Sequence, residues 1–186
     1  MKSLFIFLFP LTLFAHPVIY QGGVAVSSFN MEKLSNHYAL YSFTPKFSAG
    51  AENWRFDKKD FGFLKANSLL YRKNTENSQG NLYLHTGYGT ENTYQVGLEG
   101  DWETRRIYTS LKHLQFNHHR VSQGRIGFSP VEKSFNDLQV WVMFQTMVTR
   151  DETMLTPMLR FFYHNYLWEV GSSLKGEWML NLMVHL

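Results

Sequence analysis

Charged residues occupy alternate positions in several otherwise apolar stretches, which places acids and bases on one face of a strand. In "TYQVGLEGDWE", acidic residues alternate with Leu98, Gly100 and Trp102. Arg and Glu are suited to paired geometry. We therefore expect these side chains to line a polar lumen, where they either attract cations or neutralise one another. The lumen candidates are Glu99, Asp101, Glu103, Arg125, Arg160, Glu169 and Glu177.

A second set of residues could bind a soft metal ion. If a leader is removed after Ala15, His16 becomes the amino terminus, and its free amine and imidazole nitrogen form a chelating pair suited to copper. Met179, Met183 and His185 share one face of the last stretch and offer thioether and imidazole ligands. Methionine is equally a common filler of irregular cores. A copper-binding envelope protein is therefore an alternative, and the main prediction includes no cofactor.

The elements that hold these residues are strands, because apolar and polar residues alternate with period two along almost the whole chain. The last stretch, "WMLNLMVHL", places Trp178, Leu182 and Leu186 on one face and Asn181 on the other. No stretch shows a capped helical repeat. The predicted strands cover residues 18–28, 37–43, 46–56, 61–72, 82–89, 93–103, 107–116, 120–128, 138–148, 155–164, 166–174 and 176–186.

Each predicted strand has the length that a tilted strand needs to cross a bilayer. The pattern predicts an all-β fold, a closed antiparallel up-and-down transmembrane β-barrel of twelve strands, with ten or eight strands as alternatives. The connections at the end away from the termini are short, the first covering about residues 29–36. We therefore expect function in the wall or the lumen of the barrel.

Length and composition set further bounds. The chain of 186 residues fits one domain, and the absence of cysteine excludes disulfides and thiolate sites. The net charge of +3 comes from scattered residues without a basic stripe, so no nucleic-acid partner is predicted. Residues 1–15 combine Lys2, the apolar run Leu4 to Phe14 and the small Ala15, which predicts a signal peptide followed by a barrel domain over residues 16–186.

Alternation alone fits a soluble barrel with an apolar interior as well as a membrane barrel with an apolar exterior. Charges within the strands favour the membrane barrel, since they can pair across a lumen. Aromatic residues near the predicted strand ends favour it too, because such rings build interfacial girdles. These are Tyr20, Tyr38, Trp54, Phe56, Tyr71, Tyr88, Trp102, Tyr166, Trp168 and Trp178. A soluble exported barrel that holds a small apolar ligand is the first alternative.

The predicted leader, the lack of cysteine, the short alternating strands and the apolar final strand together resemble the small outer-membrane β-barrel proteins of Gram-negative bacteria. The resemblance implies contact with outer-membrane lipid, and recognition of the last strand by the barrel-insertion machinery. The chain departs from that class by ending in Leu186, where an aromatic residue is usual. "HPVIYQGG", "GDWETRR" and "LRFFYHNYL" also resemble an uncharacterised bacterial envelope family. The implied role is a small pore or transport-associated barrel, of undetermined oligomeric state.

Some barrels of this class are lipid-modifying enzymes, and their deacylases carry an H-x-S-N stretch. Here "SNHYALYS" contains Ser35, His37 and Ser42 in a different order and spacing. A G-x-S-x-G nucleophile motif is also absent from the sequence. The sequence therefore predicts no catalytic residues, and a lipid-modifying enzyme stays as a further alternative.

Overall fold

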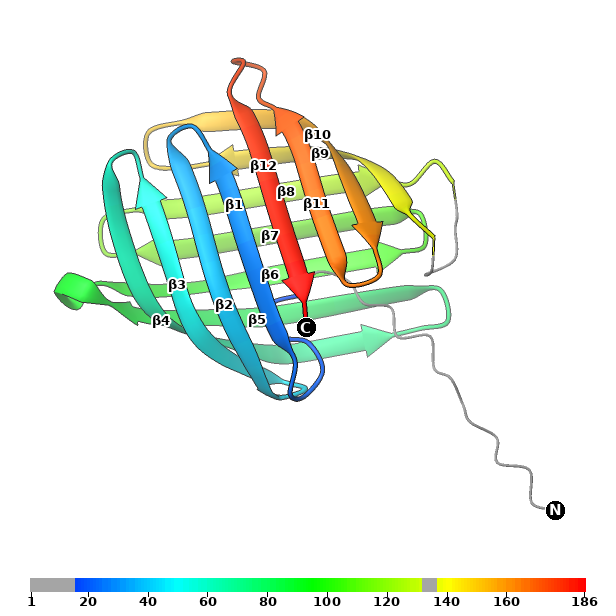
Figure 1. The fold of residues 1–186 in the computed structure, drawn as a ribbon, viewed down its shortest axis with the longest axis horizontal. Helices are drawn as coiled ribbons and strands as arrows, with labels where there is room; N and C mark the ends of the chain where they lie inside the picture. The colour runs from blue at the N-terminus through cyan, green and yellow to red at the C-terminus, as the bar shows by residue number, and fades with distance from the viewer. Residues whose placement is uncertain (1–15, 132–136) are drawn as a thin grey trace.

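Twelve antiparallel strands form the wall of a closed barrel in the computed structural model, which describes residues 16–131 and 137–186 (Figure 1). The predicted signal peptide, residues 1–15, lies outside the described residues. The elements are β1 (Val24–Met31), β2 (Leu34–Thr44), β3 (Phe47–Phe56), β4 (Lys59–Asn74), β5 (Ser78–Gly89), η1 (Thr90–Asn92), β6 (Tyr94–Thr104), β7 (Ile107–Phe116), β8 (Arg120–Phe128), β9 (Gln139–Val148), β10 (Thr153–Tyr163), β11 (Tyr166–Ser172) and β12 (Trp178–His185).

Each strand pairs with its neighbours in sequence, and β1 also pairs with β12, so that the sheet closes on itself. In Figure 1 the front strands β1 to β3 cross the back strands β5 to β8 steeply, as expected when tilted strands close into a barrel. Closure leaves no unpaired strand edge within the sheet. The prediction of a closed antiparallel barrel with twelve strands is confirmed, and the alternatives of ten or eight strands are wrong.

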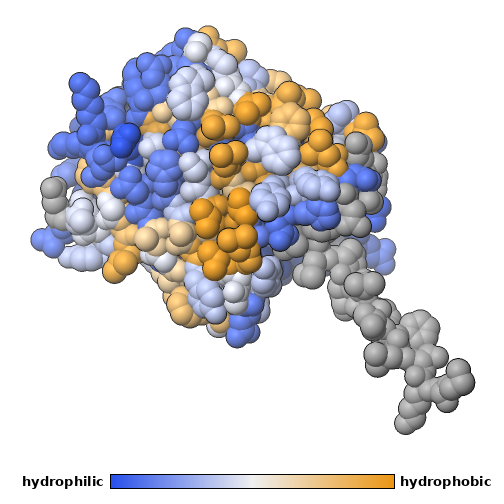
Figure 2. All heavy atoms as spheres, viewed as in Figure 1, coloured by the Kyte–Doolittle hydropathy of each residue, from blue (hydrophilic) through white to orange (hydrophobic). Residues whose placement is uncertain are grey.

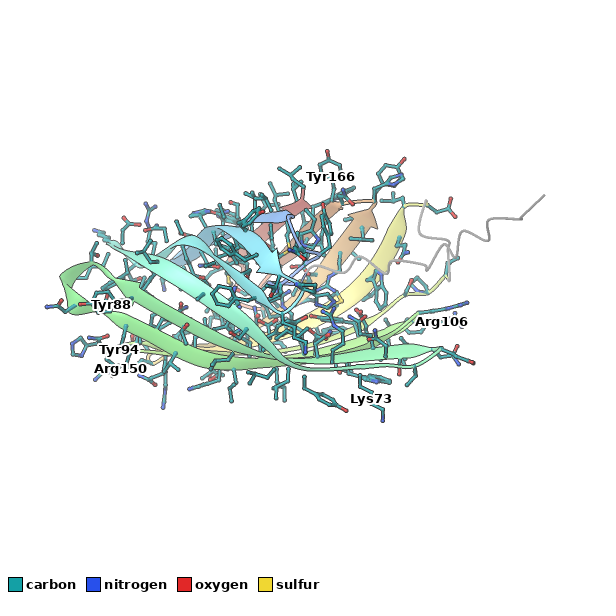
Figure 3. All side chains as sticks on the ribbon, turned by 90° about the horizontal axis from the view of Figure 1, so that it is seen from below. Lys73, Tyr88, Tyr94, Arg106, Arg150 and Tyr166 are labelled. Atoms are coloured by element: carbon teal, nitrogen blue, oxygen red, sulfur yellow. The ribbon has the colours of Figure 1, made fainter. Side chains whose placement is uncertain are left out.

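The two ends of the barrel differ in what lies there. β1 starts and β12 finishes at the same end, here called the near end, and the opposite end is called the far end. Tyr88, Tyr94 and Arg150 lie toward the far end, whereas Arg106 lies toward the near end (Figure 3). The first far-end turn is only residues 32–33, shorter than the predicted 29–36, because pairing between β1 and β2 continues to Asn30 and Ser35.

The first predicted strand began too early. Residues 18–23 belong to no strand, and β1 starts at Val24. Val18 and Ile19 are consecutive and both buried, and Val18 packs against the inward Leu69 and Tyr83. The left-handed backbone of Gly22, with a φ of 86°, turns the chain into β1. Residues 16–23, here called the N-terminal segment, therefore enter the near end of the barrel, with residues 16–19 buried and residues 20–22 exposed.

The apolar face of the strands points outward. On β12, Trp178 and Leu182 are 54% and 45% exposed, whereas Asn181 and His185 are 5% and 2% exposed. Figure 2 shows apolar side chains on the outside of the wall over β12 and β1, and hydrophilic ones toward the far ends of β1 to β4. No helix within the described residues has the length and apolar character needed to cross a bilayer.

The inside of the barrel also contains a large apolar cluster, which the sequence analysis did not predict. Trp54 stacks on Phe56 with ring centroids 5.6 Å apart, and both face inward, as does Tyr38. These three aromatic residues were wrongly assigned to interfacial girdles. The inner apolar cluster fills the far half of the lumen and reaches down β9 and β10. Its buried members are Phe29, Met31, Leu34, Trp54, Phe63, Leu114, Phe116, Val121, Trp141, Met143, Met147, Met154, Met158 and Met179.

Candidate functional site: the charged lumen

One buried carboxylate lies at the centre of the largest polar network in the lumen. Glu169 is fully buried on β11 and lies directly opposite Arg160 on β10. Arg160 Nε donates to Glu169 Oε1 at 2.7 Å, and Asn181 Nδ2 donates to Oε2 at 2.7 Å. Arg125 Nη1 lies 3.3 Å from Oε2. Two arginines and an amide on three different strands therefore converge on one carboxylate.

Both arginines have a second partner that fixes their position. The Arg160 guanidinium lies over the Tyr108 ring, 4.4 Å from its centroid, a cation–π contact. Arg125 Nε donates to Gln145 Oε1 at 2.9 Å. The network is therefore held from several sides and fills part of the bore, as expected for paired charges in a narrow barrel.

A second network joins β4 to β7 around Glu99. Lys112 lies opposite Glu99 in the register, and its Nζ is 3.2 Å from Glu99 Oε2. His85 Nε2 lies 2.9 Å from the same oxygen, and His85 Nδ1 lies 2.7 Å from Asn67 Oδ1. Lys112 keeps 22% of its side-chain surface exposed, so one cation of this network faces the open part of the lumen.

A third contact pairs Lys65 with Glu52 across β3 and β4. Lys65 Nζ lies 2.5 Å from Glu52 Oε1, and Asn36 Nδ2 donates to the same oxygen at 3.0 Å. Both charged side chains are almost fully buried. Lys65, Lys112, Glu52 and His85 were not among the sequence candidates. The alternation of the strands indicates which way such side chains point. Lys65, for example, lies two residues from Phe63 and two from Asn67 in the same strand, so the three side chains share one face.

The N-terminal segment occupies the near end of the lumen through His16. His16 Nδ1 lies 3.4 Å from Asp101 Oδ2, and His16 Nε2 lies 3.8 Å from Glu103 Oε1 and 3.1 Å from Gln79 Nε2. Burial lowers the pKa of His16, but hydrogen bonds and charge attraction from Asp101 and Glu103 outweigh it and raise this pKa to about 9. His16 therefore carries a positive charge at neutral pH.

Backbone and apolar contacts also fix the N-terminal segment. Ser48 Oγ donates to the Pro17 carbonyl at 2.8 Å, and the Ile19 amide donates to Ser42 Oγ at 3.2 Å. Val18 packs with Leu69 and Tyr83 in a small buried cluster. Between this segment and the inner apolar cluster lies a cavity of about 110 Å³, room for several water molecules.

The structure brings most of the predicted lumen residues together. Glu99, Asp101, Glu103, Arg125, Arg160 and Glu169 all face the inside, in the three networks around Glu169, Glu99 and His16. Glu177 lies apart from them in the turn before β12, and its Oε1 is 3.7 Å from Lys33 Nζ.

The metal candidates lie at separate positions along the lumen. Met179 belongs to the inner apolar cluster, and the Met183 sulfur accepts a hydrogen bond from the Tyr38 hydroxyl at 3.9 Å. His185 is buried near the other end of β12, and its ring nitrogens have no hydrogen-bond partner among the described residues. Within residues 16–131 and 137–186, no three His, Cys, Asp or Glu residues form a group that could hold a metal ion.

Comparison with known proteins identifies the fold. No protein-family model matches the chain, and no curated protein matches it in sequence. The solved structures that match in shape include the KdgM porin, and the KdgM porin in complex with disordered oligogalacturonate. Each has a TM-score of 0.54 and 13% sequence identity, and the match covers 88% of this chain and 97% of the porin chain. The chain therefore has the fold of a porin barrel.

Proposed function

We propose that this protein is a bacterial outer-membrane β-barrel that serves as a narrow, gated pore for small polar solutes. The observation that carries the proposal is the closed twelve-stranded barrel with apolar side chains outside and ion-paired charges inside. In water, an outward apolar face of this size would be costly, whereas in lipid it is the stable arrangement. The porin fold of the two structural neighbours supports the same reading.

Outer-membrane lipid is then the partner of the outer wall. Residues such as Leu64 and Leu111, 75% and 74% exposed, would contact acyl chains. The outward Tyr88, Trp102, Tyr166 and Trp178 would lie near the headgroups. Removal of a leader before His16, and recognition of β12 by the barrel-insertion machinery, complete the proposed route to the membrane.

The lumen favours a small solute over a long polyanion. One of the porin neighbours was solved with oligogalacturonate, whose sugar units carry carboxylates. In this chain Lys65, Lys112, Arg125 and Arg160 are already paired with inward carboxylates, so these four cations add little unpaired positive charge to the bore. Arg72 donates instead to the amide oxygen of Asn81 at 2.7 Å. The N-terminal segment and the inner apolar cluster narrow the path at its two ends, and an apolar constriction can gate a pore by dewetting.

Planar bilayers test this proposal. The chain without its leader, refolded in detergent, should insert and give small or rarely open channels. A variant lacking residues 16–23 should give larger and more frequent openings. Heat-dependent mobility on a gel should accompany folding. A purified chain that stays monodisperse in buffer without detergent, or a truncated variant that folds but never conducts, contradicts the proposal.

A further inference from the structure

The outer wall carries a serine and a histidine in direct contact, on a surface otherwise suited to lipid. Ser28 on β1 and His37 on β2 face each other in the register on either side of the two-residue turn. Ser28 Oγ lies 3.0 Å from His37 Nδ1. Both side chains point outward and are partly exposed.

A neighbouring amide orients the serine hydroxyl. Asn30 Nδ2 donates to Ser28 Oγ at 3.0 Å. Since this oxygen accepts from Asn30, its own hydrogen is directed to the other close partner, His37 Nδ1, in the tautomer that carries the proton on Nε2. A hydroxyl within hydrogen-bond reach of an imidazole acceptor is the arrangement of an activated nucleophile and its base.

The surroundings of this pair are apolar on one side and polar on the other. On β12, Leu182 lies opposite Ser28 and Leu180 lies opposite Asn30. On the other side Asn53 lies opposite His37, and its amide donates to Asp60 Oδ1 at 3.2 Å. Asp60 also pairs with Arg55 at 3.0 Å. An amphiphile could therefore lay its acyl chain along β12 and its headgroup against β3 and β4.

We propose that Ser28 and His37 form an acyl-transfer site on the outer wall, with a carboxylic ester of a membrane lipid as substrate. Ser28 Oγ attacks the ester carbonyl carbon, and His37 Nδ1 takes the hydroxyl proton. The lipid alcohol leaves with that proton, and the acyl group stays on Ser28. Water, activated by His37, then hydrolyses the acyl ester, releases the fatty acid and restores Ser28. The site rests on the proposed function only in requiring that the outer wall face lipid.

The barrel contains its own control for this arrangement. On β7 and β8, Ser122 Oγ lies 2.8 Å from His113 Nδ1, and both side chains also face outward. Among the described residues, no amide donates to Ser122 Oγ as Asn30 does to Ser28 Oγ. The two serines therefore share a cross-strand histidine and differ in the polar residues around them.

The experiment exposes the full folded barrel, in detergent micelles, to an alkyl fluorophosphonate and locates the modified serine by mass spectrometry. Ser28 should react faster than Ser122, because Asn30 orients the Ser28 hydroxyl toward His37 and Ser122 lacks such an amide among the described residues. Loss of the base in His37→Ala should slow the labelling of Ser28 about 100-fold, the size of effect that a positioned base gives. Ser28→Ala should abolish the labelling, His37→Ala and Asn30→Ala should slow it, and Ser122→Ala should leave it unchanged. In phosphatidylglycerol vesicles, fatty-acid release should follow the same order.

Equal labelling of Ser28 and Ser122, or no labelling of Ser28 in a chain with heat-dependent gel mobility, overturns the inference. These results leave the pore proposal intact, since channel conductance needs neither residue. A chain that inserts into bilayers and labels at Ser28 but gives no channels contradicts the pore instead. If Ser28→Ala loses its heat-dependent mobility, Ser28→Thr takes its place as the test variant. Threonine retains a hydroxyl, so this variant should fold but react more slowly with the fluorophosphonate.

Discussion

Replacing Glu169 by alanine should destabilise the barrel more than any other single change in its lumen. The substitution removes the carboxylate on which Arg160, Arg125 and Asn181 converge. Glu169 is fully buried and Arg160 nearly so, so water cannot readily take over the role of the carboxylate. Two guanidinium groups would then face each other without the anion that separates them.

The expected loss of folding stability depends on the contacts that Arg125 and Arg160 keep after the substitution. Removing one member of a buried ion pair costs about 3–5 kcal/mol, because the remaining charge is uncompensated. Arg125 keeps its hydrogen bond to Gln145, and Arg160 keeps the Tyr108 ring at 4.4 Å. These retained contacts place the effect at the lower end of that range, about 3 kcal/mol. In the double variant with Arg160→Ala, the loss should fall short of the sum of the single losses by about 2 kcal/mol.

Urea unfolding in lipid, followed by the fluorescence of the five tryptophans, measures this loss as a shift of the midpoint at constant slope. Glu152→Ala is the control. Glu152 pairs with Lys175 at the far-end surface, where an exposed pair adds little stability. If Glu169→Ala unfolds at the same urea concentration as Glu152→Ala, the Glu169 network does not hold the lumen together, and the charge-pairing argument is wrong.

Three further predictions concern the outer wall and the N-terminal segment. Leu111→Arg should lower the stability of the membrane-inserted barrel by about 2–4 kcal/mol, measured by urea unfolding in lipid, because Leu111 is exposed in the middle of β7. Leu174→Arg, equally exposed but in a turn, should change little. His16→Ala should increase cleavage of residues 16–23 by an added protease, because it removes the contacts to Asp101 and Glu103. The folded pKa of His16, about 9, exceeds the ordinary 6.5, so its stabilising charge is fully present below about pH 6.5 and is lost as the pH rises through 9. Protease cleavage and channel opening should therefore both increase between pH 7 and pH 10, and the increase should be absent in His16→Ala.

The sequence by itself determined the strands of this protein and the grouping of residues on their faces. Period-two alternation depends only on the geometry of the extended backbone, so it was readable without any knowledge of neighbours. It gave twelve strands, and it placed Glu99, Asp101 and Glu103 on the same face of one of them. It failed at residues 18–23, where apolar residues resemble a strand but pack inside the barrel against side chains from distant strands.

Tertiary structure alone decided which side chains meet. Whether an apolar face points inward or outward depends on closure of the whole sheet, and so does the difference between Trp54 in the inner cluster and Trp178 on the outside. The contacts of Arg160 with Glu169 and of Ser28 with His37 depend on the register, which the lengths of the turns fix. The two-residue turn extends the pairing of β1 with β2 beyond Ser28 and His37, so that these two residues face each other within the sheet. Pairing partners in a barrel are set by strands closing around a common axis, and that information is absent from any single strand.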